Sequence, residues 1–148
     1  LHLDIKPANI FISMEGRPVL LDFGAARITL SEEAMKLKPM YTAGFAAPEH
    51  YRFKPEELGP WSDIYSVGAT MYTCIAGTPP QASDQREQKD RMIPLRTLAR
   101  QQYSDELYAV VESCLEIDYL KRPQTAFDLQ KRLSEREPIF GLPLNQLA

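Results

Sequence analysis

The sequence contains few of the residues that bind transition metals or cross-link a chain. Its 148 residues include two cysteines and two histidines. Cys74 and Cys114 lie far apart, and neither belongs to a Cys-x-x-Cys pair or neighbours a histidine. This pattern does not fit a zinc site, a disulfide framework or a thioredoxin-like redox motif. We therefore expect two reduced thiols in a protein of the cytoplasm.

The sequence also lacks long hydrophobic runs and any large excess of charge. No stretch reaches the roughly 18 consecutive apolar residues of a membrane-spanning helix, and no signal peptide is visible. The formal net charge of −3 does not indicate a nucleic-acid-binding surface. Hydrophobic residues make up 44% of the chain and charged residues 25%, as in ordinary globular domains. The composition predicts one globular domain and leaves its function to local motifs.

Polar side chains near the N-terminus form the most informative pattern. Asp4, Lys6 and Asn9 lie on one short segment, and a second carboxylate, Asp22, follows. Transfer of a phosphoryl group to a hydroxyl depends on positioning and charge neutralisation more than on covalent chemistry. The pattern therefore predicts Asp4 as the acceptor of the hydroxyl proton and Lys6 as the cation beside the phosphate. It predicts Asn9 and Asp22 as magnesium ligands.

Two short apolar runs lie between these polar residues. Residues 10–13 and 19–22 are separated by a turn that contains Gly16. This spacing predicts a β-hairpin. The hairpin would place Asn9 and Asp22 at its two open ends, close together in space, which supports their assignment to one metal site.

Further motifs follow in an order typical of one enzyme family. They are His2–Asn9, Asp22-Phe23-Gly24, Ala47-Pro48-Glu49, Trp61–Gly68 and the arginine of residues 118–123. In these motifs and their order, residues 1 to about 134 resemble the large, C-terminal lobe of protein kinases. A lysine two positions after Asp4 resembles the serine/threonine-specific members of the family. The sequence of residues 2–9 resembles that of bacterial kinases of the eukaryotic-like (Hanks) type.

The resemblance implies a role for each residue that matches a motif. It implies ATP and Mg²⁺ as cofactors and a Ser or Thr hydroxyl of a protein substrate as acceptor. Asp4 and Lys6 would be catalytic, and Lys6, Asn9 and Asp22 would bind the nucleotide and its metal. Thr42 would lie on the substrate shelf, bonded to Asp4 and Lys6. The residues implied to be structural are His2, Phe23, Gly24, Glu49, Asp63 and Arg122.

Two of these structural expectations are specific enough to test. Glu49 and Arg122 are expected to form a buried ion pair. Asp63 is expected to bond the backbone near His2 and Leu3.

Leu3 departs from the family pattern. Many kinases have an arginine here, which grips a phosphorylated activation loop, and a leucine cannot pair with a phosphate. We therefore expect a kinase that does not depend on loop phosphorylation through this contact.

The expected fold is mostly helical, the large-lobe bundle of a kinase with one small β-hairpin and no small lobe. Apolar residues at three- and four-residue steps predict a buried helix over 61–76, with Ser62 as N-cap and Gly77 as its end. Further helices are expected over 104–115, capped by Ser104, and over 125–134. Residues 81–90 are polar and fit a surface helix or a loop. Residues 25–46 fit an activation segment, and we divide the chain into a partial catalytic domain, 1–136, and a tail, 137–148.

The chain opens inside the kinase pattern. No Gly-rich loop and no Val-Ala-Ile-Lys strand precede residue 1. We expect a piece of a kinase domain that is inactive when isolated. Helices that would cover part of the 61–76 helix are missing from this piece, so the exposed apolar surface predicts a homo-oligomer.

Two other functions remain open. One is a kinase-like scaffold that binds partners without catalysis, which the missing small lobe favours and the intact polar residues disfavour. The other is a small-molecule phosphotransferase of the aminoglycoside type. Lys6, Gly24, the Ala47–Glu49 triplet and Arg122 argue against that second class.

Overall fold

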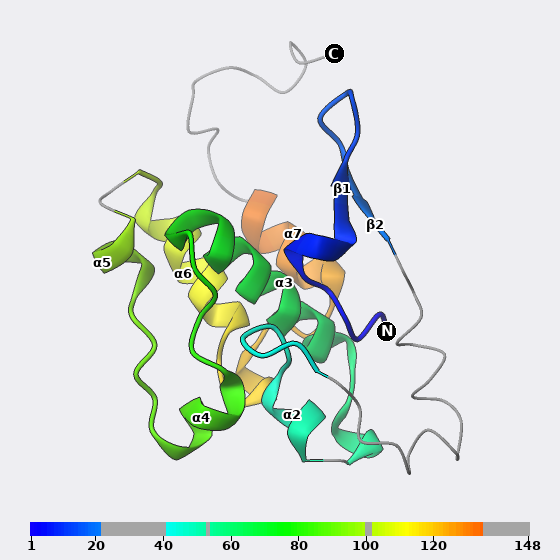
Figure 1. Ribbon diagram of the computed structural model, residues 1–148, viewed down its shortest axis with the longest axis vertical. Coiled ribbons are helices and arrows are strands. Elements are labelled where there is room, and N and C mark those ends of the chain that lie inside the picture. The colour runs from blue at the N-terminus through cyan, green and yellow to red at the C-terminus, as the bar shows by residue number, and fades with distance from the viewer. Residues whose placement is uncertain (22–40, 53, 100–101, 135–148) are drawn as a thin grey trace.

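The computed structural model describes residues 1–21, 41–52, 54–99 and 102–134, and its helices surround one long helix (Figure 1). The α-helices are α2 (Pro48–Tyr51), α3 (Pro60–Ala76), α4 (Ser83–Gln88), α5 (Leu95–Leu98), α6 (Asp105–Cys114) and α7 (Ala126–Ser134). Short 3₁₀ helices are η1 (Pro7–Asn9), η3 (Pro55–Glu57) and η4 (Tyr119–Lys121). The strands are β1 (Ile10–Ile12) and β2 (Pro18–Leu20). The mostly helical fold with one small hairpin is confirmed.

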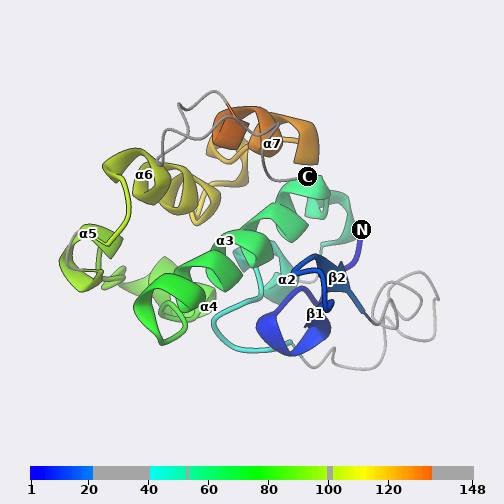
Figure 2. The same cartoon turned by 90° about the horizontal axis from the view of Figure 1, so that it is seen from above.

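The long helix α3 is the centre of the structure. Seen from above, it runs between α6 and α7 on one side and α2 with the N-terminal segment on the other (Figure 2). Tyr65, Ala69 and Tyr72 of α3 are buried in one apolar cluster with Val111 and Leu115. Because α3 is buried on most of its faces, it can position side chains from distant parts of the sequence.

The ends of α3 follow from its sequence, with one correction. Pro60 occupies the first turn, where its missing N–H costs nothing. Gly77 ends the helix in the left-handed conformation, at φ 77°, as predicted. The prediction that Ser62 is the N-cap is wrong. Gly59 is the N-cap, and the Ser62 hydroxyl, three positions later, accepts the Gly59 N–H at 3.2 Å.

The predicted hairpin is present but shorter than expected. Ile10 pairs with Leu20 and Ile12 with Pro18 in an antiparallel register. The Leu21 N–H donates to the Asn9 carbonyl at 2.8 Å, so the strand ends meet where expected. Figure 1 shows the hairpin projecting from the helical body. Asp22, the other residue expected at this end, lies outside the described residues.

The later helices also agree with the sequence pattern. The Ser104 hydroxyl caps α6 by accepting the Leu107 N–H at 3.2 Å. For residues 81–90 the sequence fitted either a surface helix or a loop, and the structure shows the short helix α4 there. None of the helices in the described part of the chain is long and apolar enough to span a membrane. The proposed tail, 137–148, lies outside the described residues.

Candidate active site

Three of the predicted site residues lie together on the surface of the body. The Lys6 ammonium is 3.0 Å from Asp4 Oδ2 and donates to Thr42 Oγ1 at 2.9 Å. The Thr42 hydroxyl donates to Asp4 Oδ1 at 3.4 Å. Thr42 is far from Asp4 in the sequence, so this contact joins the segment of Asp4 and Lys6 to a second part of the chain. The Lys6 and Asp4 side chains are 23% and 28% exposed, which leaves the group open to a substrate.

Asn9 completes this group. Its amide Nδ2 donates to the Asp4 carbonyl at 2.8 Å and to Asp4 Oδ2 at 2.9 Å. These two bonds orient the side chain, and the amide Oδ1 accepts no hydrogen bond from the described residues. An amide oxygen is a ligand type that suits Mg²⁺. The expected partner in metal binding, Asp22, and its neighbours Phe23 and Gly24 lie outside the described residues.

The backbone beneath the group is held by Asp63 of α3. Its two carboxylate oxygens accept the N–H groups of His2 at 2.7 Å and Leu3 at 2.8 Å. Leu3 has φ 66°, a left-handed conformation that is unfavourable for a side chain with a Cβ. Charge-assisted bonds to two successive N–H groups stabilise that bend. Asp63 therefore fixes the backbone from which Asp4 projects.

The His2 ring links this segment to the hairpin. Nδ1 accepts the Asp4 N–H at 3.3 Å, and Nε2 donates to the Leu21 carbonyl at 3.1 Å. Both ring nitrogens thus have roles that fit a neutral imidazole. Because Leu21 directly precedes Asp22, this bond sets where the chain enters the expected metal-binding triplet.

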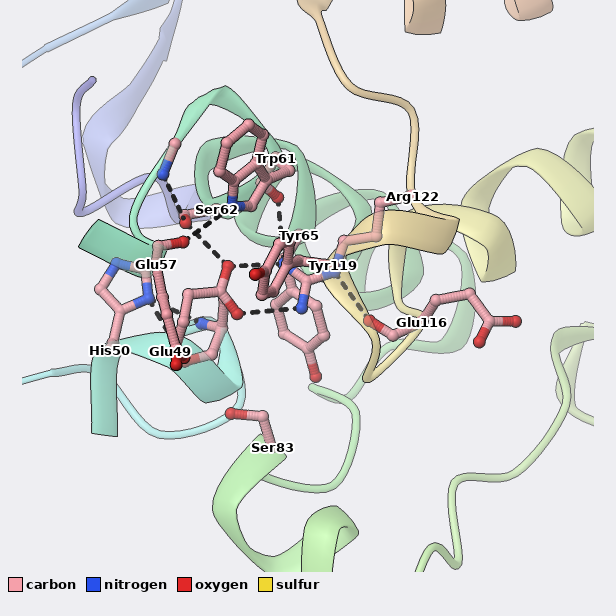
Figure 3. A network of polar contacts seen from close by, with 12 residues as sticks. Glu49, His50, Glu57, Trp61, Ser62, Tyr65, Ser83, Glu116, Tyr119 and Arg122 are labelled. Atoms are coloured by element: carbon pink, nitrogen blue, oxygen red, sulfur yellow. Dashed lines mark hydrogen bonds and ion pairs between the residues drawn. The ribbon is translucent and has the colours of Figure 1, made fainter. Parts of the chain in front are cut away.

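Glu49 and Arg122 form a fully buried ion pair at a separate place (Figure 3). Arg122 Nη1 donates to Glu49 Oε1 at 2.7 Å and Nη2 to Oε2 at 3.0 Å. The remaining guanidinium hydrogens reach the carbonyls of Trp61, Glu116 and Ile117. All five donors of the arginine are therefore satisfied.

The surroundings of this pair keep Glu49 ionised. Burial alone would raise the pKa of the Glu49 carboxyl, but the hydrogen bonds and charge of Arg122, with the Ser62 hydroxyl at 2.7 Å, lower it below 4.5. The Tyr65 ring lies 4.9 Å from the guanidinium carbon, a cation–π distance. The pair joins α2 to the segment before α7, and it has no exposed atom with which to meet a substrate.

The sequence did not assign a role to three further buried polar residues. They are Ser66 on α3 and Ser83 and Arg86 on α4. Ser66 is a polar residue of α3, a helix whose sequence pattern is defined by its apolar positions. Ser83 and Arg86 belong to a segment whose composition suggested surface exposure. The one available signal was their spacing of three residues, which places both on one face of a helix.

Comparison with known proteins identifies the family. The protein kinase domain pattern matches residues 1–133, and this chain belongs to the protein kinase family. Among its curated relatives are bacterial serine/threonine kinases. PknK of Mycobacterium tuberculosis is 30% identical over 156 aligned positions, which cover 99% of this chain and 14% of PknK. PknE of the same species is 36% identical over 85 positions, covering 57% of this chain and 15% of PknE.

A solved structure agrees in fold as well as in sequence. The structure described as PpkA-294 apo form matches with a TM-score of 0.75 and 38% identity, over 90% of this chain and 46% of that one. The chain thus spans less than half of that structure and about one seventh of PknK. The bacterial serine/threonine-type resemblance is confirmed, and the match is to part of a kinase domain.

Proposed function

We propose that the protein carrying this chain transfers the γ-phosphoryl group of ATP to Ser or Thr hydroxyls of protein substrates. The observation that carries the proposal is the contact of Asp4, Lys6 and Thr42 at one partly exposed place. Asp4 would accept the proton of the attacking hydroxyl. Lys6 would neutralise charge on the transferring phosphoryl group, and its bond to Thr42 holds the ammonium in place.

Mg²⁺ and ATP fit the residues that are present. The Asn9 amide is oriented by Asp4 and offers an oxygen, and the hairpin ends place the chain that leads to Asp22 beside Asn9. When bound, the metal would neutralise charge on the phosphates.

The proposal assigns two partners to this chain. One is the protein substrate. The other is a nucleotide-binding small lobe, which the kinase pattern places before residue 1 and without which we expect the fragment to be inactive. The exposed hairpin side chains Phe11, Ile12 and Met14 are apolar surface of the kind that seeks a partner. Without such a lobe we expect the isolated chain to form a homo-oligomer, and light scattering that shows a monomer would contradict this.

The test compares phosphotransfer by the full-length gene product with that of an Asp4→Asn variant. We expect Asp4→Asn to lower the rate by at least about a hundredfold, because general-base catalysis contributes about 10²–10⁴. Asp118→Asn is the matched control, because this exposed carboxylate caps η4, where it accepts the Leu120 N–H. Equal rates in both variants would contradict the proposal. A wild-type product that phosphorylates no protein would favour the scaffold function instead.

A further inference from the structure

Helix α4 buries polar side chains, although its sequence suggests a solvated helix. Its buried residues are Ser83 and Arg86, one turn apart on the same face. A helix of this length is not stable by itself, and it usually depends on burying an apolar face. Specific hydrogen bonds from Ser83 and Arg86 therefore hold α4 on the body.

Arg86 fixes α4 to the centre of the fold. Its Nη1 donates to the Leu115 carbonyl at 2.7 Å and to the Tyr65 hydroxyl at 3.2 Å. Its Nε and Nη2 hold Asp90 at 3.1 and 2.8 Å. The guanidinium joins α4 to α3 and to the end of α6, so the position of Ser83 is set by the core.

Ser83 and Ser66 bond to neighbouring carbonyls in the segment that follows Thr42. The Ser83 hydroxyl donates to the Ala46 carbonyl at 2.7 Å, and the Ser66 hydroxyl donates to the Phe45 carbonyl at 2.8 Å. Both serines are buried, with Ser83 fully inaccessible and Ser66 3% exposed. Two helices, α3 and α4, thus bond to two successive peptide groups.

The same two residues, Phe45 and Ala46, are also bonded to Thr42. The N–H groups of Phe45 and Ala46 donate to the Thr42 carbonyl at 3.1 and 3.2 Å. Between them and Thr42 lies Gly44, at φ 87°, where a Cβ would come within 3.0 Å of Pro79 Cβ in the loop before α4. The turn of residues 42–46 is therefore closed internally and packed against the approach to α4.

We propose that Ser66 and Ser83 are positioning residues, which hold the turn of residues 42–46 so that the Thr42 hydroxyl stays on Asp4 and Lys6. The inference rests on the proposed function, because it assigns these serines to the same site. Neither serine touches the reacting groups. Each acts through a backbone carbonyl, the turn and Thr42, and Arg86 supplies the support that keeps Ser83 in place.

The first test measures hydrogen exchange of backbone amides in this chain, which needs no catalysis. Ser83→Ala removes the donor to the Ala46 carbonyl. We expect exchange of the Phe45 and Ala46 amides to become about tenfold faster, because the turn loses a buried hydrogen bond. Amides of α6 should keep their protection. The control is Thr70→Val, which removes a buried hydroxyl that donates to the Ser66 carbonyl within α3 at 2.9 Å.

Three results would overturn the inference. Unchanged exchange at Phe45 and Ala46 would show that Ser83 does not hold the turn. Equally faster exchange throughout α6 would show a general structural role. The same local effect in Thr70→Val would show that any lost buried hydroxyl loosens the turn. Ser83→Cys, which keeps the volume but is a weak donor, should behave as Ser83→Ala and so separates the bond from packing.

The second test is a double-mutant cycle on the phosphotransfer rate of the full-length gene product. We expect Ser83→Ala to lower kcat about ten- to a hundredfold, with the KM for ATP changed less than about twofold, because a small misplacement of a reacting group has large effects. When Thr42 is already Val, Ser83→Ala should cost little more.

Independent losses in the two variants would contradict action through Thr42. A wild-type product without kinase activity would contradict the proposed function, and the exchange measurement would still decide whether Ser83 holds the turn. The failures of the two proposals are therefore distinguishable.

Discussion

Glu49, Arg122 and Ser62 are the same three kinds of chemical group as Asp4, Lys6 and Thr42: a carboxylate, a cation and a hydroxyl. In the first set the ion-pair distance is 2.7 Å and both side chains are fully buried. In the second it is 3.0 Å, and about a quarter of each charged side chain is exposed. In the first set, every N–H donor of Arg122 bonds to a protein oxygen. In the second set, the charged groups of Asp4 and Lys6 remain accessible to solvent. Exposure thus separates a structural ion pair from one that can act on a substrate.

The choice of cation agrees with this difference. An arginine presents a planar fork of donors, which suits two parallel bonds to one carboxylate. Arg122 uses that fork on Glu49 and fixes three carbonyls in addition. A lysine is a compact point charge on a flexible stem, which suits a group that must follow a moving phosphoryl. We therefore expect substitutions in the two sets to affect different properties.

The largest effect on stability is expected from breaking the buried pair. Arg122→Ala leaves Glu49 as a buried, uncompensated charge, and Glu49→Ala does the reverse. Either change should lower the free energy of unfolding by about 3–5 kcal/mol. Chemical denaturation of this chain measures it, and a melting temperature unchanged by either substitution would exclude a stabilising role for the pair.

A double substitution sharpens that prediction. Replacing both partners by Met removes the charges together, so the Glu49→Met, Arg122→Met variant should be more stable than either single alanine variant. A double variant as unstable as the sum of the two single losses would mean that the lost carbonyl bonds of Arg122, and not the unpaired charge, dominate the cost.

The next largest effect is expected at Asp63, which supports the exposed set from below. Asp63→Asn exchanges one acceptor oxygen for an N–H donor that faces a backbone N–H of His2 or Leu3. We expect a loss of about 1.5–3 kcal/mol in the free energy of unfolding, as for hydrogen bonds to charged groups. Asp118→Asn, which affects one exposed bond at η4, should cost less than about 1 kcal/mol. Equal losses in the two variants would contradict the support assigned to Asp63.

Much of this fold was predictable because its motifs carry local physical requirements. The Gly77 end of α3, the Ser104 cap of α6 and the hairpin each follow from a few neighbouring residues. The N-cap of α3 was misassigned because a serine suits both the N-cap and the third helical position. In the structure Gly59 is the N-cap and Ser62 occupies the third helical position.

The roles of Ser66, Ser83 and Arg86 could not be predicted for a different reason. Each of these side chains donates to a backbone carbonyl. Every residue has a backbone carbonyl, so the sequence does not indicate which carbonyl a given side chain will bond. Only the packing of α4 and the turn of residues 42–46 against α3 brings donors and acceptors together. The charged site residues were accessible from the sequence because their chemistry is specific to their side chains.

A smaller loss of stability is expected at acidic pH, through the buried side chain of His50. Burial lowers the pKa of His50 below 6.5, although the nearby carboxylates of Glu49 and Asp63 oppose this shift. A histidine with a lowered pKa in the folded state favours folding above pH 6.5 and loses that contribution as the pH falls below it. We therefore expect the melting temperature to fall between pH 7 and 5.5, before Glu49 begins to protonate.

The control for this prediction is His50→Asn. The amide oxygen can still accept the Ala47 N–H that His50 Nδ1 accepts at 3.1 Å, but it does not titrate. The variant should show a flatter dependence of melting temperature on pH than the wild type. Identical slopes would assign the acid sensitivity to other groups.

The smallest effect on stability is expected where the effect on catalysis should be largest. Asp4→Asn removes a charge from a partly exposed pair, and such pairs contribute about 0–1 kcal/mol to folding. The amide keeps one oxygen, which can accept either the Thr42 bond or the Lys6 bond, because these bonds use different oxygens of Asp4. The site is partly exposed, so water can satisfy the other group, and we expect the free energy of unfolding to change by less than about 1 kcal/mol. Denaturation curves of Asp4→Asn and Arg122→Ala, measured together, therefore test the contrast between the two sets. A loss at Asp4 as large as that at Arg122 would mean that exposure does not separate them.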